Sequence, residues 1–174
     1  HRQLQTIALA VRTDRGKFRT PPFHYYDTTN IAAFDAFEVD TDDDEIEVVY
    51  RFDRRPLYAE IRPEEGRNVR ILGLHLKGKV LYGAYEWSRW WQRADTNRRK
   101  IFAQATQLRL EFLDPFLEDE VTQQTPLIVC GGINDGPGLD AGEKRLFGSA
   151  VERLMGLVWR PELCLGNALF DGLD

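Results

Sequence analysis

Two apolar strands separated by one long amphipathic helix constrain the fold of this chain most strongly. The run 69–76, VRILGLHL, consists mainly of strand-forming aliphatic residues and predicts a strand. Residues 95–118 place apolar side chains on one helical face, at Ile101, Ala105, Leu108 and Phe112. Residues 126–130, PLIVC, are wholly apolar, which is typical of a strand covered on both sides. This order of elements predicts an α/β or α+β domain built in layers.

The other segments predict shorter elements around this core. Residues 4–13 predict a buried strand, 46–53 and 57–61 predict two more, and the stretch around Pro21-Pro22 predicts irregular structure. Asp140 predicts a helix N-cap, with Glu143 as its capping-box partner. We expect that helix to end at Gly156. Its expected buried face consists of Leu146, Phe147, Ala150, Val151, Leu154 and Met155.

Composition and charge exclude several classes of protein. The 174 residues include 43% hydrophobic ones, enough to form a core, and no run approaches the roughly 18 apolar residues of a membrane helix. The net charge of −5 disfavours a protein that coats nucleic acid. Cys130 and Cys164 are the only cysteines, and we expect both to be buried and reduced. The acidic run 38–47 fails the calcium-loop pattern and predicts a solvated loop.

Polar residues close both strands of the central pattern. His75 lies near the end of the run 69–76, where alternation places it on the face of Ile71 and Gly73. Asn134 and Asp135 follow the strand 126–130 in the loop GGINDGPG. Loops at strand ends often hold active sites, because a rigid scaffold positions them. Taken singly, His75 also fits a structural histidine and the Asn-Asp pair a tight turn.

Together these segments resemble the endonuclease/exonuclease/phosphatase family, which includes deoxyribonuclease, inositol phosphatases and sphingomyelinases. Residues 54–61 look like the strand before the family's histidine strand, 71–79 (ILGLHLKGK) like the histidine strand, and 126–140 like its Gly-Asp-x-Asn strand end. Residues 143–170 further resemble a bacterial branch of the family.

The resemblance implies a fold and a chemistry. The fold is a deoxyribonuclease-like four-layer α-β-β-α sandwich, and the activity is hydrolysis of a phosphoester substrate with Mg²⁺ or Mn²⁺. On this interpretation His75 contacts the scissile phosphate and Asn134 orients the phosphate or its attacking water. Lys77 and Asp135 then support the phosphate and the loop.

The chain departs from the family pattern in two ways. Gly132 stands where the family has an aspartate that activates water or holds metal, so the metal site is incomplete. The family's upstream glutamate and downstream Asp-His segments do not occur in residues 1–174. We therefore expect one apparently truncated domain over 1–174, either part of a larger parent polypeptide or a degenerate relative. Such a hydrolase would be inactive or severely impaired and would self-associate through open sheet edges. The alternative is a non-catalytic binding or assembly module on the same scaffold.

The stretch 85–100 suggests a preference among substrates. It interleaves three tryptophans, among them Trp90, with five basic residues, among them Arg93 and Arg99. Such a pattern suits single-stranded nucleic acid slightly better than a phospholipid surface. The alternative is that the tryptophans pack under the helix and the arginines are solvated. The compartment stays open, with a soluble cytoplasmic protein favoured over a secreted one.

Overall fold

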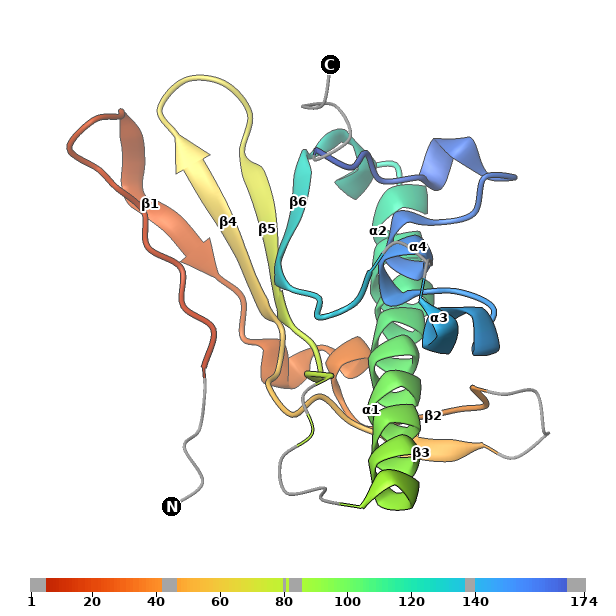
Figure 1. Ribbon diagram of the computed structural model, residues 1–174. Coiled ribbons are helices and arrows are strands. Elements are labelled where there is room, and N and C mark those ends of the chain that lie inside the picture. Colours follow the sequence, from red (N-terminus) through yellow and green to blue (C-terminus); the bar gives the residue numbers. More distant parts are fainter. Residues whose placement is uncertain (1–5, 42–46, 80, 82–85, 137–139, 169–174) are drawn as a thin grey trace.

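The computed structural model describes residues 6–41, 47–79, 81, 86–136 and 140–168, and its architecture is a mixed sheet with helices (Figure 1). Four strands form the main sheet in the order β1-β4-β5-β6. They are β1 (Phe18–Tyr25), β4 (Leu57–Pro63), β5 (Val69–His75) and β6 (Leu127–Gly132). A separate hairpin pairs β2 (Phe37–Val39) with β3 (Val48–Tyr50). The general α+β class is therefore confirmed.

The helices gather on one side of the main sheet (Figure 1). The long helix α1 (Trp87–Leu108) continues through a π-helical turn, η3 (Arg109–Leu113), into α2 (Asp114–Glu118). The predicted helix 95–118 is thus confirmed, with an earlier start. Two short helices, α3 (Ala141–Arg145) and α4 (Ala150–Met155), follow β6. Short 3-10 turns complete the described elements at Thr28–Asn30, Ala32–Phe34, Thr122–Gln124 and Pro161–Leu163.

The core lies between the sheet and α1. Leu72 and Leu74 of β5 are fully buried against the predicted helix face of Ile101, Ala105 and Leu108. The two faces of β5 therefore carry the predicted residues: the leucines point toward the helix, and the face of Ile71, Gly73 and His75 points away from it. Burial of these side chains provides most of the stabilisation that holds α1 on the sheet, since each contributes about 1.5–3 kcal/mol.

The opposite face of the sheet is apolar but carries no helix. Phe23, Tyr25, Ile71 and Ile128 share this face, because paired strand residues point the same way. Tyr25 is 53% exposed and Ile128 is 48% exposed. Of the described residues in the predicted first strand, 6–13 have no regular secondary structure, so that prediction is wrong for them. Their chain nevertheless crosses this face: a Cβ added to Gly73 would lie 3.2 Å from Cγ2 of Ile7.

Several further predictions are corrected by the structure. The stretch around Pro21-Pro22 is part of the edge strand β1, whose pairing with β4 is irregular between Phe18 and Phe23. Proline is tolerated there because an edge strand leaves one side of its backbone unpaired. The strand predicted at 46–53 is confirmed only over Val48–Tyr50. Cys130 and Cys164 are exposed, not buried.

The helix predicted from Asp140 to Gly156 is divided in two. The Asp140–Glu143 capping box is present, and Gly156 closes α4 with a φ of 107°. Between them, Phe147 has a φ of 55° and is 98% exposed, so its predicted burial is wrong. A second capping box, in which Ser149 and Glu152 exchange hydrogen bonds, starts α4 anew. Local capping by Ser149 therefore overrode the continuous apolar pattern.

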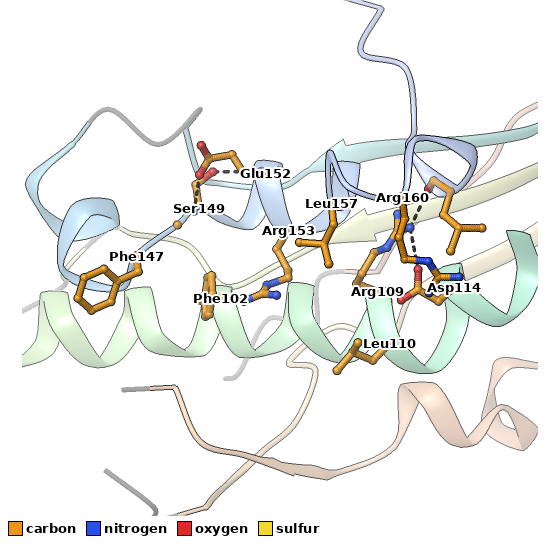
Figure 2. A pocket seen from close by; sticks show the side chains of 13 residues that line it. Phe102, Arg109, Leu110, Asp114, Phe147, Ser149, Glu152, Arg153, Leu157 and Arg160 are labelled. Carbon is orange, nitrogen blue, oxygen red and sulfur yellow. Dashed lines mark hydrogen bonds and ion pairs between the residues drawn. The ribbon is translucent and has the colours of Figure 1, made fainter. Parts of the chain in front are cut away.

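A hollow of about 290 Å³ lies between α1–η3 and α4 (Figure 2). Arg153 stacks over the Phe102 ring at 4.9 Å on its wall. Arg109 is buried there, donates to the carbonyl oxygens of Leu154 and Leu163, and pairs with Asp114. No residue from the carboxyl ends of β5 and β6 lines this hollow, so it is separate from the site described next.

Candidate functional site

The carboxyl ends of β5 and β6 bring together the residues that the sequence singled out. These two strands are parallel, and His75 lies directly opposite Gly132. A hydrogen bond from the Leu76 N–H to the Gly132 carbonyl (2.9 Å) continues the pairing beyond β5. Parallel strands place their carboxyl ends at one edge of a sheet, which is where open α/β sheets bind ligands.

His75, Gly132 and Asn134 form one cluster. A Cβ built on Gly132 would lie 3.2 Å from Cδ2 of His75 and 3.7 Å from Nδ2 of Asn134. Asn134 has a φ of 61°, in the left-handed region that asparagine tolerates better than most residues. Its Nδ2 donates to the Leu76 carbonyl at 2.8 Å, which fixes the loop after β6 to the chain after β5. The structure therefore brings the predicted histidine and asparagine together around position 132.

The two glycines of the Gly-Gly pair have different roles. A side chain on Gly131, whose φ is 123°, would collide with the Leu74 carbonyl, so β5 and β6 require glycine there. Gly132 has neither constraint, and only the His75 ring would have to move by a few tenths of an ångström. The glycine at position 132 thus removes a side chain that the backbone would accept.

His75 is half-buried at this edge. Burial, with a smaller contribution from the positive charge of Arg54, lowers the pKa of its imidazole below the ordinary value of 6.5. Among the described residues, the imidazole has no hydrogen-bond partner. A neutral ring nitrogen of His75 is therefore available to a ligand.

Lys77 follows His75 by two residues, and its backbone is fixed by a buried glutamine. Gln104 of α1 accepts a hydrogen bond from the Lys77 N–H at 2.9 Å and donates to the Arg51 carbonyl at 3.0 Å. Within the described part of the chain, the Lys77 ammonium makes no hydrogen bond or ion pair. It is thus a charge available near the end of β5.

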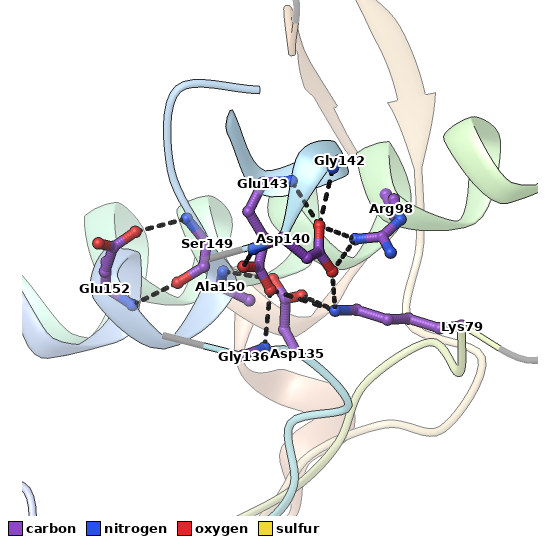
Figure 3. A network of polar contacts seen from close by, with 10 residues as sticks. All are labelled: Lys79, Arg98, Asp135, Gly136, Asp140, Gly142, Glu143, Ser149, Ala150 and Glu152. Atoms are coloured by element: carbon purple, nitrogen blue, oxygen red, sulfur yellow. Dashed lines mark hydrogen bonds and ion pairs between the residues drawn. The ribbon is translucent and has the colours of Figure 1, made fainter. Parts of the chain in front are cut away.

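Asp135 belongs to a polar network behind the cluster (Figure 3). Its carboxylate is bound by Lys79 Nζ at 2.6 Å and by the Ala150 N–H at 2.7 Å. Lys79 also contacts Asp140 and the buried Glu143, each at 3.2 Å. Asp135 therefore supports the loop, as the sequence predicts, and its oxygens are already bound.

Hydrogen bonds determine the charge state of this network. Burial alone would raise the pKa of Glu143, but the Asp140 N–H and Lys79 outweigh it and hold the pKa below its ordinary value. Burial would likewise raise the pKa of Asp140, yet the Glu143 N–H, Arg98 and Lys79 lower it. Burial would lower the pKa of the Lys79 ammonium, but its contacts with Asp135 and Asp140 outweigh burial and raise that pKa above its ordinary value. The carboxylates of Glu143 and Asp140 and the Lys79 ammonium are therefore charged at neutral pH.

The predicted substrate-binding residues Trp90, Arg93 and Arg99 lie on α1, which begins beyond the carboxyl ends of β5 and β6 (Figure 1). Trp90 is partly exposed and contacts Trp91 edge-on at 4.9 Å. Arg99 pairs with Asp95 at 2.8 Å. None of the atoms nearest position 132 belongs to α1, so the structure does not join these residues to the His75–Asn134 cluster.

The basic character of this helix is largely compensated. Arg89, Arg98 and Lys100 also pair with carboxylates, at Glu86, Asp140 and Asp53. The side chain of Trp87 is outside what the structure describes, as are residues 42–46 of the acidic run. The sequence-level charge of this stretch therefore overstates the positive field that a ligand would meet.

The described residues around Gly132 do not fit a magnesium or manganese site. Mg²⁺ prefers carboxylate and other oxygen ligands, whereas the cluster supplies an imidazole, an amide and a glycine. The nearest carboxylate in sequence, Asp135, is occupied by Lys79 and the Ala150 N–H. In the described part of the chain, no group of three or more His, Cys, Asp or Glu side chains is arranged to hold a metal ion.

Comparison with known protein families, curated proteins and solved structures finds no match to this chain. Among the described residues, no helix is both long and apolar enough to cross a membrane.

Sequence reasoning missed the residues that hold the site in place. Lys79 closes the motif 71–79 but received no role from it, and Arg98 and Gln104 lie outside the strand-end motifs; the partners of all three are 27 to 64 residues away in the chain. The capping box did identify Asp140 and Glu143, but only as local helix caps. The available signal was a second lysine, Lys79, four residues after His75 on the same connection.

Proposed function

We propose that the carboxyl ends of β5 and β6 form a phosphoester-binding site of the endonuclease/exonuclease/phosphatase type. The observation that carries this proposal is the convergence of His75 and Asn134 on Gly132 from adjacent parallel strands. The two residues were selected by motif, and the fold places them in one cluster. Lys77, two residues beyond His75, adds a positive charge at the same strand end.

Each residue has a role suited to a phosphate. Neutral His75 donates one ring N–H, and Asn134 keeps one amide N–H after its bond to the Leu76 carbonyl. The Lys77 ammonium supplies the charge that attracts a phosphate dianion. Together these groups bind and orient a phosphoester through their own hydrogen bonds and charge.

The apolar face without helices supports a four-layer sandwich. A sheet normally buries its apolar face against another layer, and one face of this sheet is already covered by helices. Phe23, Tyr25 and Ile128 are available for a second sheet on the other side. His75 and Gly132 share this open face, so the proposed site would lie at the end of the cleft between two sheets.

Phosphoester hydrolysis is the ancestral activity in this proposal, and Gly132 impairs it. An aspartate at position 132 would place a carboxylate between His75 and Asn134. We expect Gly132→Asp to raise Mg²⁺-dependent hydrolysis of a phosphodiester by at least about tenfold, since loss of a principal catalytic group costs orders of magnitude. A Gly132 protein that is already as active as the variant would refute the role of this position.

Binding is tested by titrating the full chain with inorganic phosphate and with a phosphodiester, using calorimetry. His75→Ala and Asn134→Ala should each weaken binding about tenfold, which corresponds to about 1.4 kcal/mol. His24→Ala is the matched control, because His24 is an exposed histidine on the far edge strand β1. Equal binding by all four proteins would overturn the proposed site.

A non-catalytic binding module on the same scaffold is the second candidate. The observation that favours it is the lack of a free carboxylate beside His75 and Asn134 among the described residues. It predicts phosphate binding that depends on His75 and Asn134, together with no hydrolysis even in Gly132→Asp. Recovery of hydrolysis in that variant would instead favour the impaired enzyme.

Nucleic acid is the preferred phosphoester in this proposal, ahead of phospholipid. Trp90 and Trp91 are partly exposed and offer stacking surfaces at the start of α1. Trp90→Ala and Arg93→Ala should weaken binding to a single-stranded oligonucleotide, and the affinity should fall with salt. Arg160→Ala, at the far end of the helical layer, is the charge-matched control. Binding to anionic vesicles without oligonucleotide binding would reverse this preference.

A further inference from the structure

Behind the His75–Asn134 cluster, one lysine neutralises two buried carboxylates. The side chain of Glu143 is 3% exposed and that of Asp135 is 7% exposed. Lys79 Nζ contacts both, at 3.2 Å and 2.6 Å, and also reaches the less buried Asp140. A buried carboxylate without a cation is strongly destabilising, so this ammonium determines whether the pair can remain ionised.

The same two carboxylates hold the loop after β6 through backbone hydrogen bonds. Asp135 accepts from the Ala150 N–H at the start of α4 (2.7 Å). Glu143 accepts from the Gly136 N–H at 3.0 Å and from the Asp140 N–H at 2.8 Å. Figure 3 shows that the carboxylates accepting these bonds lie around the Lys79 ammonium. The loop that carries Asn134 is therefore fastened to the starts of both α3 and α4.

Lys79 connects this loop to the other half of the site. It lies four residues after His75, on the segment that leaves β5. Asn134 and Lys79 thus tie the chain after β6 to the chain after β5, the first through the Leu76 carbonyl and the second through Asp135. Arg98 of α1 holds Asp140 at 2.7 Å and completes the charge balance on that side.

We propose that Lys79 is a positioning residue that holds Asn134 beside His75 by neutralising Asp135 and Glu143. This inference rests on the proposed phosphoester site and adds a residue that does not touch the ligand. Among the described residues, the charged groups facing Lys79 are Asp135, Asp140 and Glu143, with Arg98 beyond Asp140.

The proposal predicts a pH dependence that loss of packing alone would not produce. In the wild type, Glu143 has a lowered pKa, so its stabilising contribution persists above its ordinary value of 4.5 and is lost only as the pH falls through the lowered pKa. In Lys79→Met the burial remains while the cation is lost, so the pKa of Glu143 rises. The variant loop should then loosen as the pH rises and the carboxylates ionise without a partner.

The experiment measures the dissociation constant of the full chain for phosphate at each pH and divides the value for the variant by the value for the wild type. Because phosphate and His75 titrate in both proteins, their titrations cancel in this ratio. For Lys79→Met we expect a loss of about tenfold at about pH 8 and of less than about twofold at about pH 5.5. Lys79→Arg should bind within about threefold of the wild type.

A double variant and a control complete this experiment. Lys79→Met combined with Asp135→Asn should recover most of the loss, because the amide oxygen of the new side chain still accepts from the Ala150 N–H while one buried charge is removed. Lys144→Met, which changes an exposed lysine of α3, is the control.

A second measurement separates this inference from the proposed function. Hydrogen exchange of the Gly136 and Ala150 amides reports directly on the loop. Exchange becomes faster with pH in any protein, and in Lys79→Met the rate should increase with pH more steeply than it does in the wild type. If the wild type binds no phosphate, the proposed function fails while these amides still decide the role of Lys79. A variant that folds only at low pH supports the proposal. A loss that is equal at every pH, or that Asp135→Asn does not relieve, would overturn it.

Discussion

The two faces of the four-stranded sheet differ in what covers them. On one face Leu72 and Leu74 are fully buried under α1 and belong to the central core. On the other face Tyr25 and Ile128 are about half exposed, and the irregular chain at 6–13 is the cover that the described residues provide. Both faces of the two central parallel strands are largely apolar, because β5 and β6 each alternate between two sets of mostly apolar side chains. Helices thus pack against one face of the sheet and leave part of the other face exposed.

The difference bears on where the proposed site lies. His75 and Gly132 belong to the face without helices, at the carboxyl end of their strands. The leucine face serves stability, while the open face carries the cluster that we propose as a phosphate site. A site on an open face depends on the loops behind it for rigidity, which is the role we assign to Lys79 and its carboxylates.

The largest expected effect is a difference in stability between the faces. Leu72→Ala should lower the free energy of unfolding by about 2–5 kcal/mol, because it leaves a cavity under α1. Ile128→Ala should cost about 1 kcal/mol, since half of its side chain is already in water. Urea denaturation monitored by tryptophan fluorescence measures both. Equal costs would mean that the open face is covered in solution.

Self-association is expected through the open face and the β6 edge. Exposed apolar surface next to an unpaired strand edge favours pairing between chains. Tyr25→Ser combined with Ile128→Ser should weaken the association by about tenfold, which corresponds to the loss of about 1.4 kcal/mol of apolar contact. Val121→Ser, which changes an exposed residue outside the sheet, is the control. Sedimentation that shows a monomer at all concentrations would contradict this expectation.

The sequence predicted the elements in which local pattern and tertiary packing agree. The strand 69–76, the helix 95–118 and the capping box at Asp140 are confirmed because each has a strong period or a specific hydrogen-bonding motif. The segment 6–13 is as apolar as a strand, but it has no described partner for its backbone. Hydrophobic content predicted a buried strand, whereas residues 6–13 are irregular and partly exposed.

Sequence reasoning identified residues that lie together at the strand ends and missed those behind them. His75 and Asn134 stand at positions that the strands determine, so the motif order was enough to bring them together. Lys79 contacts Asp135 and Glu143 from far along the chain, across 64 residues for Glu143, and no local period encodes such a contact. Exposure of Cys130 was also missed, because the wholly apolar run 126–130 predicted a strand covered on both sides, whereas Ile128 and Cys130 lie on the face without helices.

The titration of His75 gives a smaller effect that still distinguishes the faces. Its lowered pKa means that the folded state favours the neutral ring, so this stabilisation is present above the ordinary pKa of 6.5 and is lost as the pH falls through the lowered value. NMR titration should therefore give His75 a midpoint below 6.5, and bound phosphate should raise that midpoint by stabilising the imidazolium. At constant pH, phosphate should leave the ring signals of His24, on β1, unchanged. A layer that covers the open face would lower the His75 midpoint further.

The smallest effect uses the two cysteines as reporters of coverage. Cys130 lies on the open face of β6, whereas Cys164 lies in the segment after α4 and donates its S–H to the Leu157 carbonyl at 3.3 Å. Both cysteines are exposed, so a water-soluble thiol reagent should label both of them at low protein concentration, where the chain does not associate. At concentrations where the chain associates, labelling of Cys130 should slow by a few-fold while that of Cys164 is unchanged. Protection of Cys164 and not of Cys130 would mean that the chains associate through the segment after α4. Association through the open face of the sheet would then be wrong.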